Sequence, residues 1–80
     1  MIAGLVTADR KDADETGAQH GWTIEQHGGG TTYRRGRLTL EVDWTHQDQL
    51  RWAGARTGPG YNKQTDRQWE LLSWLESDAR

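Results

Sequence analysis

The sequence predicts an α+β fold, in which a three-stranded antiparallel meander lies between an N-terminal and a C-terminal helix (α-β-β-β-α). Residues 22–54 alternate between apolar and polar positions and are broken by glycines, as is typical of strands and turns. The segments on either side carry apolar residues at helical spacing. Because the connections are short, we expect neighbouring strands to pair and both helices to pack on one face of the sheet.

Composition limits the class of protein. Eighty residues without cysteine predict one domain, residues 1–80, with no disulfide to stabilise it. Five Trp, two Tyr and no Phe predict a thin core built largely from indole rings. The net charge of −2 means that binding to nucleic acid would need a local basic patch. No signal peptide or membrane span is recognisable, so we expect a cytoplasmic location and no membrane partner.

The first helix is expected over residues 5–19, with a weak apolar stripe. Thr7 is placed to act as its N-cap. Gly21, after His20, can adopt the left-handed conformation that ends a helix.

Residues 22–44 are expected to be mostly extended. Residues 22–26 alternate, residues 28–30 form a glycine loop, and an extended pattern resumes over residues 31–35. Gly36 predicts a bulge or a tight bend. The clearest strand spans residues 37–44, and its inward row is Leu38, Leu40, Val42 and Trp44.

A turn at residues 46–48 leads to a further strand, in which Leu50 and Trp52 are expected to point inward. Residues 57–62 contain two glycines and a proline, which predict a loop. Thr65 and Gln68 match a capping box at the start of the last helix. The apolar face of that helix consists of Trp69, Leu71, Leu72, Trp74 and Leu75.

Two tryptophans of the last helix are five positions apart. Trp69 and Trp74 therefore project about 140° apart on an ideal helix. One of them is expected in the core, and the other is then available to a partner, because Trp is enriched at interfaces. The alternative is that all five Trp build the core.

The leading candidate site combines a tyrosine with three arginines. Guanidinium groups bind phosphates through paired hydrogen bonds, and tyrosine can stack on an unpaired base. This run therefore predicts a surface for nucleic acid or another partner, formed by Tyr33, Arg34, Arg35 and Arg37. The alternative is that the arginines are solvated and pair with Glu25 and Glu41 across the sheet.

The histidines form a second candidate. His27 precedes the glycines and could act as general acid or base in RNA cleavage, because imidazole titrates near neutrality. The alternative is that His20, His27 and His46 are exposed turn residues. Their spacing matches no common metal-ligand pattern, so no metal site is predicted. No nucleotide-binding motif is recognisable, and no cofactor is expected.

Three segments resemble the HicA family of small toxins: Gly21-Trp22-Thr23-Ile24-Glu25, Gly30-Thr31-Thr32-Tyr33-Arg34 and Leu38-Thr39-Leu40-Glu41-Val42. The resemblance covers less than half of the chain. It implies the α-β-β-β-α fold that resembles double-stranded-RNA-binding domains, and it implies mRNA cleavage. That family has its catalytic histidine directly after the glycine turn, where this chain has Thr31 and Thr32.

We therefore expect a small non-enzymatic binding protein that acts on a host protein or a nucleic acid. The excess of Arg over Lys and the frequent Gly and Ala suggest a GC-rich bacterial or phage genome. We expect a phage or mobile-element accessory factor. Two alternatives remain open. One is a HicA-like mRNA-cleaving toxin with His27 as acid or base, and the other is a protein-only interaction module, including a homodimer, that uses an exposed Trp.

Overall fold

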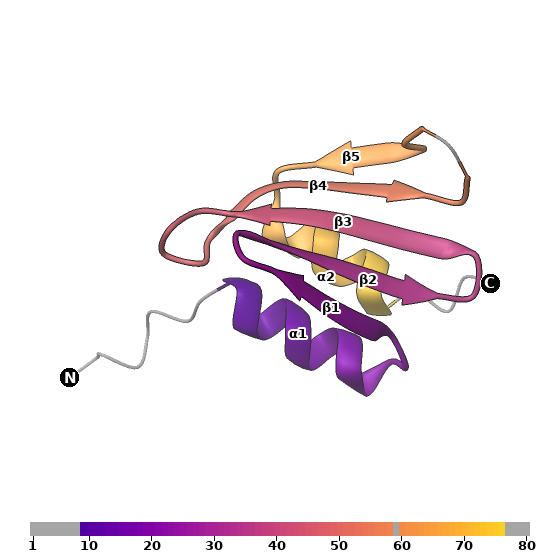
Figure 1. Ribbon diagram of the computed structural model, residues 1–80, viewed down its shortest axis with the longest axis horizontal. Helices are drawn as coiled ribbons and strands as arrows, with labels where there is room; N and C mark the ends of the chain where they lie inside the picture. The colour runs from indigo at the N-terminus through magenta and orange to yellow at the C-terminus, as the bar shows by residue number, and fades with distance from the viewer. Residues whose placement is uncertain (1–8, 59, 77–80) are drawn as a thin grey trace.

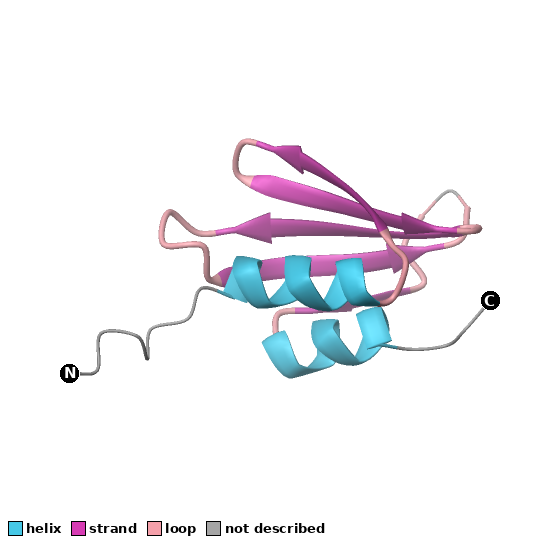
Figure 2. Cartoon of the chain, turned by 90° about the horizontal axis from the view of Figure 1, so that it is seen from below, coloured by secondary structure: helices cyan, strands magenta, loops and turns pink. Residues whose placement is uncertain are grey.

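A computed structural model describes residues 9–58 and 60–76 of the chain. Within these residues, five antiparallel strands form one sheet in sequence order, and two helices lie side by side on one face of it (Figures 1 and 2). The elements are α1 (Asp9–Gln19), β1 (Thr23–His27), β2 (Gly30–Arg35), β3 (Leu38–Trp44), β4 (Leu50–Arg56), β5 (Lys63–Thr65) and α2 (Gln68–Glu76). The α+β class, the meander and the shared helix face are confirmed, whereas the expected count of three strands is too low.

One of the additional strands results from the turn at the glycine loop. Residues 28 and 29 form a tight turn, so that β1 and β2 are separate strands with His27 opposite Gly30. Gly28 has a φ of 53°, a left-handed conformation that glycine adopts without steric cost. The next connection is equally short, because Gly36 and Arg37 alone join β2 to β3. Gly36 has a φ of 62° and forms the tight bend that the sequence predicts.

The last strand was not predicted. Residues 63–65 pair with β4, with Thr65 opposite Ala53, before the chain enters α2. The predicted capping box is wrong, because the Gln68 side chain instead donates to the backbone oxygen of Asp9 over 2.9 Å. The hydroxyl of Thr65 accepts from the backbone N–H of Arg67 over 3.0 Å and donates to Glu70 over 2.6 Å.

The described part of α1 packs closely against the sheet. Gly17 is buried, and a Cβ atom at this position would lie 3.2 Å from the ring of Tyr33, so the missing side chain allows the close approach. Gly21 follows α1 with a φ of 82°, which confirms the predicted helix end. The expected start at residue 5 and the N-cap role of Thr7 lie outside the described residues.

The core fills the layer between the sheet and the helices. Its largest members come from β2, β3 and α2, together with Trp22: Tyr33, Leu40, Val42, Trp44, Leu71, Trp74 and Leu75. Two of the buried tryptophans have a partner for the indole N–H, because Trp22 donates to the backbone oxygen of Leu75 over 2.8 Å and Trp44 donates to Thr31 over 2.9 Å. Trp74 is 7% exposed and Trp69 is 68% exposed, which confirms that the two point in different directions.

A bulge in β4 reverses the alternation of that strand. Trp44 pairs with Leu50, but Asp43 pairs with Trp52, so Arg51 is an extra residue on β4. Leu50 packs against the core, as predicted. Trp52 instead lies on the opposite face of the sheet, and the prediction that it points inward is wrong. Beyond the bulge, β4 contributes Ala53 and Ala55 to the core.

Candidate functional site: the open face of the sheet

The helices cover one face of the sheet, and we call the opposite face the open face. Successive side chains of a strand alternate between faces, so the strand pairing assigns each residue to one of them. The open face carries Thr23, Glu25, His27, Thr32, Arg34, Thr39, Glu41, Asp43, Trp52, Gly54, Arg56 and Gln64. It is a mostly polar surface, with the Trp52 ring towards one end.

Tyr33, the predicted stacking residue, does not reach this face. Its side chain is 0% exposed and lies on the helix side, where its hydroxyl donates to Asp14 over 2.6 Å. Burial, together with the hydrogen bond to Asp14, raises the pKa of Tyr33 above its ordinary value. The ring therefore cannot stack on a base in the folded protein, and the expected role of Tyr33 is wrong.

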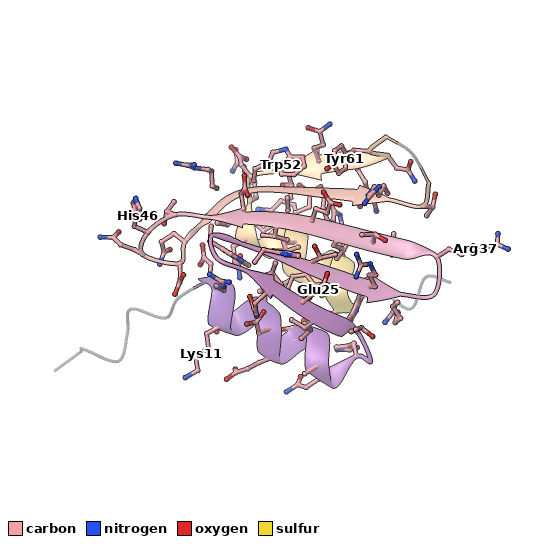
Figure 3. All side chains as sticks on the ribbon, in the orientation of Figure 1. Lys11, Glu25, Arg37, His46, Trp52 and Tyr61 are labelled. Carbon is pink, nitrogen blue, oxygen red and sulfur yellow. The ribbon has the colours of Figure 1, made fainter. Side chains whose placement is uncertain are left out.

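The three predicted arginines point in different directions. Arg34 lies on the open face and pairs with Glu25 at 3.2 Å. Arg35 lies on the helix side, with its guanidinium 4.5 Å from the centre of the Trp22 ring, and donates to the backbone of His20 over 2.9 Å. Arg37 is exposed in the turn between β2 and β3 and projects beyond the end of the sheet (Figure 3). These residues therefore do not form one basic patch.

The alternative reading of the arginines, pairing across the sheet, is confirmed in part. Arg34 and Glu25 form the expected contact between neighbouring strands. Glu41 pairs with Arg56 of β4, at 2.6 Å.

An aromatic pair dominates one side of the open face. The rings of Trp52 and Tyr61 meet edge to face, with centroids 5.1 Å apart and planes at 87° (Figure 3). Both rings lie over Gly54, where a Cβ atom would come within 2.6 Å of Trp52 and 2.7 Å of Tyr61. Hydrogen bonds fix both rings: the Trp52 indole N–H donates to Gln64 over 3.2 Å, and the Tyr61 hydroxyl donates to Glu41 over 2.6 Å.

The bond between Tyr61 and Glu41 changes how both groups titrate. Accepting this hydrogen bond lowers the pKa of Glu41, and the nearby Arg56 guanidinium lowers it further. The same bond raises the pKa of Tyr61, because donation to a carboxylate favours the protonated phenol. At neutral pH the phenol, the carboxylate and the guanidinium therefore form one connected polar network.

A hollow of about 530 Å³ lies between the aromatic pair and β1. Gly30 lies between His27 and Asp43 in the row across the sheet, and the Asp43 carboxylate lies 3.5 Å from the position that a Cβ atom of Gly30 would take. Side chains from four strands and one loop line the hollow, among them His27, Thr32, Arg34, Asp43, Trp52 and Tyr61.

The three histidines do not converge. His27 lies on the open face, with Nε2 2.8 Å from the Thr32 hydroxyl and 3.6 Å from the Glu25 carboxylate. His20 follows α1, and His46 lies in the turn between β3 and β4, at the end of the sheet opposite Arg37 (Figure 3). All three are exposed, but only His20 and His46 lie in turns, because His27 is the last residue of β1.

The described part of the chain offers neither a metal cluster nor a membrane-spanning helix. Over residues 9–58 and 60–76, no three His, Asp or Glu side chains gather where they could hold a metal ion. Neither α1 nor α2 is long and apolar enough to cross a bilayer.

Sequence reasoning missed the aromatic pair for two reasons. The alternation of residues 50–54 continues unbroken if no bulge is assumed, and this assumption places Trp52 in the core. Tyr61 lies in a loop where no periodicity applies. One signal was present: Gly54 lies two residues after Trp52, and an isolated glycine in a strand often marks a close approach of another group.

The functional assignment depends on this geometry alone. Comparison of the chain with protein-family models, with curated proteins and with solved structures gives no match.

Proposed function

We propose that this chain is a non-enzymatic binding domain that docks on a protein partner through its open face. The observation that carries the proposal is the Trp52–Tyr61 pair, which lies on the side of the sheet that no helix covers. Tyr61 is 41% exposed although it is fixed by a hydrogen bond. Rigid aromatic side chains that remain partly accessible are typical anchors of protein interfaces.

The charges of the open face favour a protein over a nucleic acid. Three carboxylates and two guanidinium groups lie on it: Glu25, Glu41, Asp43, Arg34 and Arg56. A phosphate that approached either arginine would have to compete with a carboxylate that already pairs with it. A face with a slight negative charge and ion pairs within it resembles the polar rim of a protein–protein interface, where charged residues set the orientation of the partner.

The open face is also preorganised. Four of its five strands are joined by antiparallel pairing over five or more residue pairs, which fixes the positions of the side chains. Binding a partner would therefore cost little conformational entropy in this domain.

The proposal is tested by placing the same bulky residue on opposite sides of the molecule. Thr39 lies on the open face in β3, the middle strand of the sheet, between Arg34 and Arg56, whereas Ser73 is exposed on α2. Thr39→Tyr should block docking, and Ser73→Tyr should not. Tyrosine is well tolerated in strands, so Thr39→Tyr is expected to fold.

The measurement is affinity capture from nuclease-treated lysate of the source cells, followed by titration of the purified partner. We expect a protein that binds wild type and Ser73→Tyr equally and binds Thr39→Tyr at least tenfold more weakly. Equal binding by all three proteins would contradict docking through the open face. Loss of the captured protein after nuclease treatment would indicate that nucleic acid holds the complex together.

We propose RNA cleavage as a second candidate, on one observation. The His27 ring lies across the β1–β2 hairpin from Thr32, one of the two positions where the HicA family has its catalytic histidine. Glu25 stands 3.6 Å from the same ring and could orient it. This candidate predicts growth arrest on expression that His27→Ala relieves and His46→Ala does not. A harmless wild-type protein that leaves cellular RNA intact would exclude it.

A further inference from the structure

One row of the open face crosses four strands, and three of its four residues line the hollow. The register places His27 opposite Gly30, Gly30 opposite Asp43, and Asp43 opposite Trp52. We call these four residues the Gly30 row. Only glycine fits at position 30, because a Cβ atom there would lie 2.7 Å from the backbone oxygen of Val42. Asp43 Oδ1 lies 3.5 Å from the position of that Cβ atom, so the carboxylate extends towards Gly30.

Asp43 differs from the other carboxylates of the open face. Glu25 pairs with Arg34, and Glu41 pairs with Arg56 and accepts from Tyr61. Among the described residues, the Asp43 carboxylate has no hydrogen-bond or ion-pair partner. It is exposed and it borders the hollow, so its charge is the one that this face leaves uncompensated.

Trp52 lines the same hollow as this carboxylate. Trp52 is the cross-strand neighbour of Asp43, and side chains at such positions lie about 5 Å apart at Cβ. A cation in the hollow could pair with the carboxylate and also lie against the electron-rich indole. The chain already uses this type of contact: Arg35 covers the Trp22 ring at 4.5 Å, and Lys63 covers the Trp74 ring at 5.3 Å.

We infer that the Gly30 row binds a basic side chain of the protein partner, between Asp43 and Trp52. The inference rests on the proposed function and names the chemistry that the open face recognises. Arginine suits the site better than lysine, because its planar guanidinium can stack on the indole and donate two hydrogen bonds to one carboxylate. The two arginines assigned to the open face by strand pairing are already held, because Arg34 pairs with Glu25 and Arg56 pairs with Glu41.

The test uses two peptides that differ only in charge, acetyl-Gly-Arg-Gly-amide and its citrulline analogue, titrated into the ¹⁵N-labelled protein. We expect the arginine peptide to shift the Trp52 indole N–H signal in a saturable way, and the citrulline peptide to shift it little. Asp43→Asn should weaken binding of the arginine peptide about fivefold, as expected for the loss of one partly exposed ion pair. Asp66→Asn is the matched control and should leave the affinity unchanged, because Asp66 is exposed just before α2.

Equal shifts with both peptides would overturn the inference without any variant. Unchanged affinity in Asp43→Asn would do the same. A Trp52 shift that depends on protein concentration without peptide would assign the site to a second copy of the chain, which also contradicts the inference.

The inference and the proposed function can fail separately. If Thr39→Tyr abolishes capture of the partner but the arginine peptide does not bind, the open face recognises other chemistry and only the inference is wrong. If the peptide binds in an Asp43-dependent manner but Thr39→Tyr retains the captured partner, the proposed docking face is wrong.

Discussion

Replacement of Gly54 by alanine should separate the aromatic pair from the sheet. The added Cβ would lie 2.6 Å from the Trp52 ring and 2.7 Å from the Tyr61 ring, and real Cβ atoms do not approach other atoms so closely. Because the backbone of β4 is fixed by strands on both sides, the rings must move outward. Their movement would weaken the edge-to-face contact and the hydrogen bonds to Gln64 and Glu41.

The expected change in the free energy of unfolding is the sum of two destabilising contributions and one stabilising contribution. Overpacking costs about 1–3 kcal/mol, and the lower half of this range applies because surface rings can move. Loss of the aromatic contact adds ~0.5–1.5 kcal/mol. Alanine also restricts the unfolded chain, which returns ~0.4–1 kcal/mol. We expect Gly54→Ala to lower the free energy of unfolding by about 2 kcal/mol, or roughly 1–2 M in the urea midpoint for a protein of this size.

The matched control is Gly29→Ala. A Cβ atom at Gly29 has open space around it, and the residue has no left-handed φ, so this variant should be as stable as wild type or slightly more stable. Urea unfolding of both variants, with the Trp52 indole N–H signal as a local probe, makes the comparison. Equal midpoints for the two variants, with an unshifted Trp52 signal in Gly54→Ala, would refute the claim that the rings lie against the Gly54 backbone.

Three further changes address the core and the titrating groups. Thr31→Val should lower stability by about 1–2 kcal/mol in thermal unfolding although it adds an apolar group, because the buried indole N–H of Trp44 loses its acceptor; an unchanged melting temperature would contradict this. Wild type should lose stability as the pH rises above about 10, at up to ~1.4 kcal/mol per pH unit. The reason is that the raised pKa keeps Tyr33 protonated in the folded state, whereas the tyrosine of the unfolded chain ionises. In unfolding experiments from pH 9 to 11, the stability of Tyr33→Phe should therefore fall less steeply with pH. Tyr61→Phe should raise the pKa of Glu41 towards its ordinary 4.5, as followed by NMR titration. The pKa of Glu41 is lower in the folded protein than in the unfolded chain, so the carboxylate stabilises the fold at a pH above the unfolded pKa. This stabilisation is lost as the pH falls through the folded pKa. Tyr61→Phe should therefore lose less stability in acid than wild type.

Much of the fold could be predicted because it depends on local patterns. The inward row of residues 38–44 follows from strict alternation, and the buried members Leu40, Val42 and Trp44 lie where that pattern places them. The helix end at Gly21 and the bend at Gly36 follow from a backbone conformation that favours glycine. The strand at residues 63–65 could not be predicted in this way, because three polar residues carry no periodicity and pair only where β4 offers an edge.

The candidate site was harder to predict, because it depends on which face each side chain occupies. Tyr33 and Arg34 are neighbours in sequence and therefore point to opposite sides of the sheet, so a run of chemically similar residues in a strand does not form a cluster. His27 and Arg34 were identified from residue type, and both line the hollow. Trp52 was assigned to the core, because a bulge is set by the pairing of two strands and leaves little trace in either one.

The extra residue at Arg51 has a consequence for how this sequence can change. Before it, β4 supplies Leu50 to the core, and after it the same strand supplies Trp52 to the solvent side. Deletion of Arg51 would leave Leu50 opposite Trp44 and Trp52 opposite Asp43, now as direct neighbours in a regular strand, so both faces of β4 would keep their residues. Deletion of a residue between Trp52 and Arg56 would instead exchange the two faces for the rest of the strand. In a lineage of related chains, β4 could therefore lose one residue at position 51 without a change in either layer, whereas the rest of the strand would have to keep its length.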